Sequence, residues 1–410
     1  MSNDIQPEIR FPGFTEDWEE RKLSEMANFS KGNGYSKADL AEEGHPVILY
    51  GRLYTKYETI IENVDTFAEL KEKSVISNGG EVIVPASGET PEDISRASVV
   101  DVSGVALGGD LNIIKTKSEL DPIFLALTIS NGSQKKEMTK RAQGKSVVHL
   151  HNSDLKEVNL LYPKLDEQVK IGSFFKKLDV SIALHQRKLD LLKETKKGFL
   201  QKMFPKNGAK VPEVRFPGFT EDWEERKLSE LAEVKTGFPF KNDDFIDGGN
   251  YLVITNGNIQ NNSALVDGNI GNRISAVSDE IKDKYLLNYG DILVTMDGTV
   301  GRTAKVFEKN QILAQRVGRL VANTTPEFLY QWLNTGKFFG DMTKVSHGGT
   351  IKHISLSEIS DFNAFVPVNE DERVKIGSLL LNIDKTITLH QRKLDLLKEM
   401  KKGFLQKMFV

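Results

Sequence analysis

The chain has 410 residues, of which 39% are hydrophobic and 28% charged, and its formal net charge is −3. This length suits two domains, the composition is that of a soluble globular protein, and no apolar run approaches the roughly 18 residues that cross a membrane. The absence of cysteine excludes disulfides and thiolate metal ligands, and we expect a cytoplasmic protein. The net charge alone does not indicate nucleic acid, so a DNA-binding role must rest on local features.

An internal repeat organises the chain. The segment RFPGFTEDWEERKLSE at 10–25 recurs letter for letter at 215–230. A second block at 171–204, which ends in LHQRKLDLLKETKKGFLQKMF, returns at 376–409 with the same displacement. The sequences between these blocks share little. A repeat of such a long period predicts two half-proteins in tandem, whose middles share a fold but present different surfaces.

Both middles alternate short apolar runs with helical stretches. EVIVPASG at 81–88, YLVITNGN at 251–258 and the segment 290–307 are typical of strands bounded by Gly, Asn and Asp. PIFLALTIS at 122–130 and PEFLYQWLNTGKFFGDM at 326–342 are typical of helices. Each middle is therefore predicted to be mixed α/β.

Each copy of the second block carries a heptad seam. Its seam residues alternate at spacings of four and three, which predicts a helix of about 35 residues, or roughly 50 Å. Neither helix could bury this stripe alone, so the two are predicted to pair, and the polar seam residues His185 and His390 are interpreted as structural. The apolar seam residues are Ile171, Phe175, Leu178, Ile182, Leu189, Leu192, Ile376, Leu380, Ile383, Ile387, Leu394 and Leu397.

Three patterns approach a catalytic or metal motif, and each lacks a residue that its chemistry needs. Gly144-Lys145-Ser146 resembles the end of a phosphate-binding loop, but Thr139 stands where that loop requires glycine. The sequence DPIF at 121–124 resembles the element with which adenine methyltransferases hold the target amino group, without its second proline. His149 and His151 have no third ligand at metal spacing. No catalytic or metal site is predicted in this chain.

Several loops combine glycine, short hydrogen-bonding side chains and a cation, which suits contacts to DNA phosphates and base edges. YGRLYTKY at 50–57 interleaves aromatic and basic residues, and Arg52 is a candidate for bidentate reading of guanine. TNGN at 255–258 offers amides that pair with adenine edges. Each loop taken singly is more often an ordinary surface turn. The candidate DNA-contacting residues are Tyr50, Arg52, Tyr54, Lys56, Tyr57, Lys145, Ser146, Asn256, Asn258, Arg302, Thr350 and Lys352.

Together these features resemble the specificity (S) subunit of type I restriction-modification systems. The resemblance covers the whole chain and rests on the paired FPGFTEDWE openings, the paired LHQRKLDLLKE and KKGFLQKMF helix segments, and the phrases YGRLYTKY and GDILVTMDGTVGRTAKV. It implies an α/β (α+β) fold class, with two tandem mixed α/β DNA-recognition domains joined by two long helices that form an antiparallel coiled coil, in a pseudo-two-fold internal repeat. The implied segments are a first target recognition domain at 1–165, a first spacer helix at 166–204, a linker at 205–214, a second target recognition domain at 215–370 and a second spacer helix at 371–410.

The resemblance also implies a function. Each variable domain would read one half of a split, asymmetric site in double-stranded DNA, while the helices set the gap and dock two modification (M) subunits. Those subunits bind S-adenosylmethionine and methylate adenine at N6 on a base taken out of the stack. Two restriction (R) subunits, in systems that have them, would use ATP and Mg. This chain itself is expected to be non-catalytic, without a cofactor and away from membranes.

Two other functional interpretations stay open on the sequence. One is a self-contained DNA methyltransferase or nuclease, which would act without a partner. The other is a coiled-coil scaffold that binds proteins without DNA specificity, although that function would not explain why the middles diverge while the frames stay the same.

Overall fold

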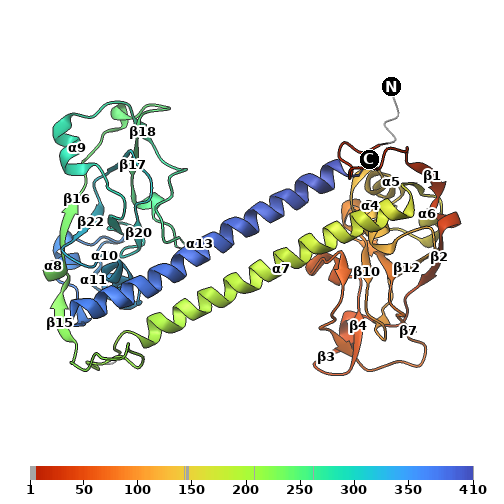
Figure 1. The fold of residues 1–410 in the computed structure, drawn as a ribbon, viewed down its shortest axis with the longest axis horizontal. Coiled ribbons are helices and arrows are strands. Elements are labelled where there is room, and N and C mark those ends of the chain that lie inside the picture. The colour runs from red at the N-terminus through yellow and green to blue at the C-terminus, as the bar shows by residue number, and fades with distance from the viewer. Residues whose placement is uncertain (1–5, 143, 145–146, 207, 262, 410) are drawn as a thin grey trace. The chain divides into compact units, whose positions relative to one another are not determined.

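The structure, a computed structural model, describes residues 6–142, 144, 147–206, 208–261 and 263–409 (Figure 1). The chain divides into two compact units. Unit 1 consists of Met1–Gln186 together with Arg392–Val410, and unit 2 consists of Arg187–Gln391. Each long helix therefore contributes its first part to one unit and its last part to the other.

Unit 1 contains two five-stranded sheets. The first has the order β2 (Ala27–Lys31), β12 (Leu111–Thr116), β8 (Glu81–Pro85), β10 (Ser98–Val100) and β5 (Ile60–Ile61). The second has the order β3 (Leu40–Ala41), β6 (Phe67–Ala68), β4 (His45–Ile48), β11 (Ala106–Leu107) and β7 (Val75–Ile76). Two small ribbons pair β1 (Glu19–Lys22) with β14 (Asn159–Tyr162), and β9 (Ser87–Gly88) with β13 (Val148–His149).

The helices of unit 1 are short apart from the spacer. They are α1 (Leu23–Met26), η1 (Lys37–Asp39), α2 (Arg52–Thr55), α3 (Pro91–Ile94), α4 (Pro122–Ser130), α5 (Gly132–Arg141), α6 (Asn152–Lys156) and the start of α7 (Leu165–Lys202). Helix α4 begins where Asp121 accepts a hydrogen bond from the Phe124 amide at 2.8 Å, with proline at the first helical position. The DPIF pattern is thus explained as a helix start.

Unit 2 repeats this plan with fewer strands. Its main sheet has the order β16 (Ala232–Thr236), β22 (Val317–Ala322), β19 (Ile292–Thr295) and β20 (Thr303–Lys305). A second sheet has the order β18 (Arg273–Ile274), β17 (Tyr251–Ile254) and β21 (Gln311–Leu313), and a ribbon pairs β15 (Glu224–Lys227) with β23 (Asn363–Val366). The helices are α8 (Leu228–Leu231), η2 (Asn242–Asp244), η3 (Asn256–Asn258), α9 (Asp279–Tyr285), α10 (Pro326–Leu333), α11 (Lys337–Val345), α12 (Leu356–Ser360) and α13 (Glu370–Lys407).

The two units share one fold, as the repeat predicts. Strands β2, β12, β8 and β10 follow the same order and the same antiparallel directions as β16, β22, β19 and β20. In both second sheets the central pairing is parallel, β11 with β4 and β21 with β17. The mixed α/β prediction is confirmed. The helix expected at 326–342 is two helices, because Gly336 takes a φ of 95° between α10 and α11.

The spacer helices α7 and α13 are each 38 residues, and so about 57 Å long. Both begin six residues before the heptad block. Within unit 1, Phe174 of α7 packs on Phe404 of α13 with ring centroids 5.1 Å apart, and Asp179 Oδ1 accepts from Lys401 Nζ at 2.5 Å. The later of these two residues in α7 contacts the earlier of the two in α13, so these helix segments run antiparallel.

Unit 2 contains the same pairing with the helices exchanged. Lys196 Nζ of α7 lies 2.7 Å from Asp384 Oδ1 of α13, at positions that match the unit 1 pair through the repeat. The end of each helix closes a hydrophobic core: Phe409 contacts Phe124 at 6.0 Å in unit 1, and Phe204 contacts Phe328 at 5.8 Å in unit 2. Each core therefore includes side chains from both spacer helices.

The seam residues lie inside these units. Eight of them are buried, namely Ile171, Phe175, Leu178, Leu189, Ile376, Leu380, Leu394 and Leu397. Four are half-buried, namely Ile182, Leu192, Ile383 and Ile387. This burial follows from the heptad spacing, which places all of these positions on one stripe of the helix.

The repeated opening segments hold the start of each spacer helix. Arg10 donates from Nε and Nη2 to the two oxygens of Glu167 in α7, at 2.9 and 2.7 Å. Arg215 makes the same forked contact with Glu372 in α13, at 2.7 and 2.8 Å. All four side chains are at most 12% exposed. These buried ion pairs give a structural reason for the identity of the two frames.

Candidate nucleic-acid interface

In unit 2, four segments that are distant in sequence meet: the loops after β17 and β19, the turn before β22, and residues 347–353. Asn256 Oδ1 accepts from the Met296 amide at 3.1 Å, and the Gly298 amide donates to the Lys352 carbonyl at 2.8 Å. A β-bridge joins Asp297 to His353. We call residues 255–258, 296–302, 315–316 and 347–353 the unit 2 loop cluster. It contains all five candidate DNA-contacting residues of this half.

Arg302 is a cation of this cluster for which the described residues provide no counter-charge. It follows Gly301, whose φ of 79° and close approach to the Met342 side chain leave no room for a Cβ atom. Its amide donates to Thr295 Oγ1 at 2.9 Å, which fixes the loop. Its Nε is buried with no hydrogen-bond partner, and no ion pair reaches it within the described residues. Such an arginine is suited to an anionic or hydrogen-bond-accepting ligand.

Three further residues of the cluster were missed from the sequence. Asp297 Oδ1 lies 2.8 Å from His353 Nδ1 and 3.4 Å from Arg316 Nη1. Arg316 has a φ of 71°, and its side chain is 56% exposed. The available signal was the polar pair QR at 315–316, which interrupts the apolar run of β21 and β22. Only strand pairing brings this turn to the other loops.

The remaining candidates of unit 2 fall into two groups. Thr350 and Lys352 are exposed, and Lys352 Nζ donates to the Gly348 carbonyl at 3.0 Å. Asn258, by contrast, is 1% exposed. Its Oδ1 accepts from the Thr255 amide at 2.9 Å, and its Nδ2 donates to the carbonyls of Asp267 and Ile270. The amide of Asn258 therefore already holds the loop together, and its predicted contact with a base stays a prediction.

In unit 1, Arg52 is likewise committed to the protein. The side chain is 7% exposed, with Nη2 at 2.7 Å from Glu58 and Nη1 at 2.5 Å from Asp65. Lys56 Nζ also lies 2.7 Å from Asp65. The hydrogen bonds from Lys56 and Arg52 lower the pKa of Asp65 to about 2. Arg52 therefore clamps the segment between α2 and β6, and its predicted reading of guanine stays a prediction.

The three tyrosines of the 50–57 loop are partly inserted into unit 1. Tyr54 donates to the Ser87 carbonyl at 2.5 Å, and Tyr57 donates to the Ala97 carbonyl at 3.2 Å. Burial raises the pKa of both hydroxyls. Tyr50 is 37% exposed and packs edge-on against Tyr54 at 5.9 Å. Tyr57 is 38% exposed and Lys56 is 52% exposed, so these two and Tyr50 have the most accessible side chains of this loop, although the Tyr57 hydroxyl is held by its bond to Ala97.

The second part of the unit 1 site is the β9–β13 ribbon. Ser87 and Gly88 pair with His149 and Val148. Gly144 of unit 1 is equivalent to Gly348 of unit 2. Their φ values are 136° and 104°, and in both a Cβ atom would collide with the carbonyl oxygen three residues later. Lys145 and Ser146 lie outside the described residues. We call residues 50–57, 86–90, 109–110, 144 and 147–149 the unit 1 loop cluster.

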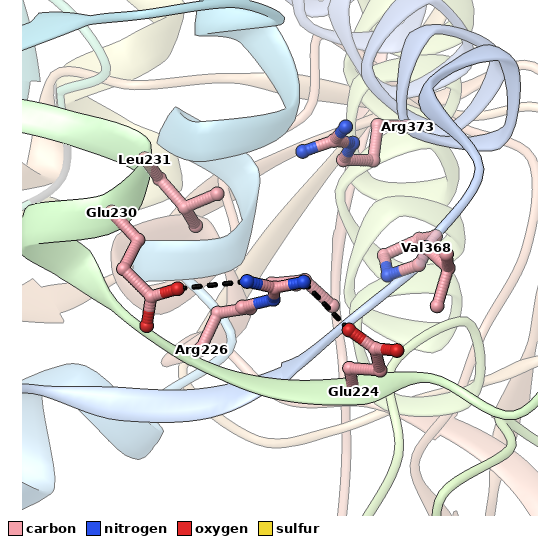
Figure 2. A pocket seen from close by; sticks show the side chains of 8 residues that line it. Glu224, Arg226, Glu230, Leu231, Val368 and Arg373 are labelled. Carbon is pink, nitrogen blue, oxygen red and sulfur yellow. Dashed lines mark hydrogen bonds and ion pairs between the residues drawn. The ribbon is translucent and has the colours of Figure 1, made fainter.

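The repeated frame forms a charged pocket in unit 2 (Figure 2). Arg226 of β15 lies between Glu224 and Glu230, at 2.7 and 2.9 Å, and so its charge is balanced. The Nε of Arg373, from the start of α13, is buried in this region without a hydrogen-bond partner. Because two of the carboxylates are already paired with arginine, the pocket is not poised for acid–base chemistry.

Among the residues with described positions, no three His, Cys, Asp or Glu side chains are grouped as a metal ion would require. His149 and His151 stack with ring centroids 6.1 Å apart. Among the described helices, none combines the length and the apolar character that a membrane span needs. What the two loop clusters offer is hydrogen-bonding and cationic side chains on a rigid frame.

Comparison with known proteins identifies this arrangement. The family model described as "Type I restriction modification DNA specificity domain" matches twice, at residues 15–194 and 220–399. The type I restriction enzyme MjaVIII specificity subunit of Methanocaldococcus jannaschii is 21% identical over 94% of this chain and 91% of its own length. The putative MjaX specificity subunit of that organism is 22% identical over 47% of this chain and 46% of its own length.

The fold has a counterpart among solved structures. The crystal structure of a type I restriction-modification system S subunit from M. genitalium aligns over 99% of both chains with a TM-score of 0.66, at 14% identity. The two matched domains span most of this chain, one in each half. The chain therefore belongs to the type I restriction-modification DNA specificity family, as a DNA-recognition subunit that is not itself catalytic.

Proposed function

We propose that the chain reads the two unequal halves of a split DNA site, with one loop cluster for each half. On this proposal residues 1–165 and 215–370 are the target recognition domains, 166–204 and 371–410 the spacer helices, and 205–214 the linker. The observation that carries the proposal is that equivalent loops in a shared fold present different side chains. Arg302 and Lys352 belong to the unit 2 cluster, whereas the unit 1 cluster contains tyrosines and His149.

The contacting residues follow from accessibility. In unit 2 we propose Asn256, Arg302, Thr350 and Lys352, of which Arg302 is the candidate for guanine and Asn256 for adenine. In unit 1 we propose Tyr50 and Lys56, together with Lys145 and Ser146. Tyr54 and Tyr57 support this surface through their hydrogen bonds to Ser87 and Ala97. The lysines would contact phosphates, which carry affinity but no sequence information.

The partners that we propose are double-stranded DNA and two copies of one modification subunit. Leucines at matching positions of the spacer helices support two equivalent docking surfaces. Leu184 and Leu396 are 60% and 53% exposed in unit 1, and Leu191 and Leu389 are 59% and 67% exposed in unit 2. Exposed leucines repeated on both helices favour a protein partner over solvent. A rigid spacer of two helices, each about 57 Å long, would hold the gap between the half-sites constant.

The chemistry would then belong to the partners. The modification subunits would bind S-adenosylmethionine and methylate adenine at N6, and restriction subunits, where the system has them, would use ATP and Mg. Because their substrate would be DNA, we propose that the complex works in the cytoplasm.

Co-expression tests the proposal directly. The chain would be produced with the modification subunit encoded beside it, and N6-methyladenine would be mapped across the host genome. A two-part motif with a constant unread gap, lost when this chain is omitted, is the expected result. A stable complex that leaves no methylation would contradict it and favour a scaffold. Methylation by this chain without a partner would contradict the non-catalytic assignment.

A second experiment tests the docking surfaces. Leu389→Glu and Leu184→Glu should each reduce co-purification of the modification subunit from two copies to one, because each removes one of two equivalent surfaces. Val211→Glu, an exposed apolar position outside the helices, is the matched control and should retain both copies. Mass measurement of the intact complex distinguishes the two stoichiometries. Two copies bound to both leucine variants would exclude these surfaces.

A further inference from the structure

We propose that one turn position reads a base in each half-site, and that its opposite charges in the two units make the half-sites differ. The position is Asp110 in unit 1 and Arg316 in unit 2. This inference rests on the proposed function and deepens it, because it assigns a donor or acceptor preference to each half.

Strand register establishes that the two residues are equivalent. Asp110 directly precedes β12, whose first residue Leu111 pairs with Pro85 of β8. Arg316 directly precedes β22, whose first residue Val317 pairs with Thr295 of β19. Both residues thus occupy the same corner of the main sheet, next to the loop that follows β8 or β19. Neither is singled out by the sequence, since the flanking residues GGD and AQR have no letters in common.

The backbone makes both positions unusual. Asp110 has a φ of 57° and Arg316 a φ of 71°, in the left-handed region where glycine is preferred. Placing another residue there costs about 1 kcal/mol or more. Both units nevertheless have a charged side chain at this corner, and both side chains are exposed. A charged residue kept at a strained turn in both units is consistent with a role for the side chain.

Both residues belong to their loop clusters, Arg316 through its side chain and Asp110 through its backbone. Arg316 Nη1 is 3.4 Å from Asp297 Oδ1 and 3.4 Å from His353 Nδ1. These contacts are long, so they orient the guanidinium without consuming its hydrogen bonds. The Asp110 carbonyl accepts from the Ala86 amide at 2.7 Å, beside the β9–β13 ribbon. Its carboxylate has no hydrogen-bond or ion-pair partner among the residues described.

The charge reversal argues for base edges and against phosphates. A position that faces the DNA backbone would favour a cation in both units, because an aspartate there would be repelled by phosphate. A base edge in the major groove offers donors and acceptors alike. Arginine pairs with the O6 and N7 acceptors of guanine, and aspartate accepts from the N4 amino group of cytosine. We therefore assign a guanine to the Arg316 half-site and a cytosine to the Asp110 half-site.

Asp297 and His353 act as positioning residues for Arg316. The carboxylate of Asp297 contacts both His353 and Arg316, and so it holds the Arg316 guanidinium within the cluster. Asp297→Asn should therefore reduce discrimination at the same base as Arg316→Ala, by a smaller factor. It should leave the other half of the motif unchanged, which a general loss of folding would not do.

The test uses the complex with its modification subunit and maps methylated motifs for each variant. Arg316→Ala should relax one guanine in the half read by unit 2, with a loss of discrimination of roughly 10- to 100-fold. Asp110→Asn should relax one cytosine in the other half. Asn310→Ala is the matched control, because Asn310 is also exposed, with a φ of 58°, but lies outside the unit 2 loop cluster. It should leave the motif unchanged.

Arg316→Lys separates base reading from backbone contact. If Arg316 reads guanine, lysine keeps the charge but loses the forked contact, and the guanine is relaxed. Base reading would be overturned if both Arg316 variants kept the motif unchanged but bound all DNA sequences more weakly by the same factor. The slope of log affinity against log salt concentration would then be smaller by about one, as expected for a lost phosphate contact. Base reading would also be overturned if Arg316→Ala and Asp110→Asn both left the motif unchanged, as the Asn310→Ala control should. In that case a two-part motif in the wild type would still support the proposed function. The absence of any two-part motif in the wild type would instead refute that function itself.

Discussion

Removing Arg215 should destabilise the junction between the second frame and α13 more than any surface substitution in that frame. Glu372 is fully buried and Arg215 is 12% exposed, and they share two hydrogen bonds of 2.7 and 2.8 Å. In Arg215→Ala the carboxylate would stay buried without a cation, which costs about 3–5 kcal/mol. At about 1.4 kcal/mol per factor of ten, that cost corresponds to roughly 100- to 5000-fold in a local opening equilibrium.

Hydrogen exchange on the full chain, read by mass spectrometry, measures this opening without assuming that both units unfold together. Amides near the start of α13 should exchange faster by that factor, while those of unit 1 serve as an internal reference. Arg226→Ala is the matched control, because its pairs with Glu224 and Glu230 are about half exposed and should contribute less than about 1 kcal/mol. Replacing both partners, Arg215→Met with Glu372→Leu, should recover most of the loss.

The reasoning would be refuted if Arg215→Ala and Arg226→Ala accelerated exchange equally, or if the double replacement were no better than the single one. The equivalent pair of unit 1 provides an independent repetition. Arg10→Ala should affect the start of α7 and leave unit 2 unchanged, because Arg10 and Glu167 have nearly the same burial, at 10% and 2% exposed.

Three further predictions concern packing, charge and pH. Phe409→Ala, which leaves a cavity in the unit 1 core, should cost about 3–5 kcal/mol, measured by exchange in unit 1; a loss below about 1 kcal/mol would contradict the packing. Asp384→Lys should destabilise unit 2, and Lys196→Asp in the same chain should restore part of the loss, as followed by calorimetry. Asp65 should titrate at about 2 by NMR, and its pKa should rise only part of the way back in Arg52→Ala, because the hydrogen bond from Lys56 remains. Because folding lowers this pKa, its contribution is present above about pH 4 and lost as the pH falls through about 2.

The sequence by itself determined the architecture. The letter-for-letter repeat and the heptad spacing predicted two units of one fold and two spacer helices with a buried stripe, and the structure contains them. Periodicity of this kind is local: a side chain's face on a helix depends only on its spacing from neighbours along the chain. For the same reason the loops with special composition were found at 50–57, 255–258, 296–302 and 347–352.

Only the tertiary structure decided which polar side chains of those loops are available. Arg52 is bound by Glu58 and Asp65, and Asn258 is enclosed by backbone carbonyls, so neither has the freedom that its residue type suggested. Arg316, in contrast, reaches the loop cluster because β22 pairs with β19. Whether a hydrogen-bonding group is already satisfied depends on neighbours brought together by strand pairing, and residue type and spacing along the chain do not specify those neighbours.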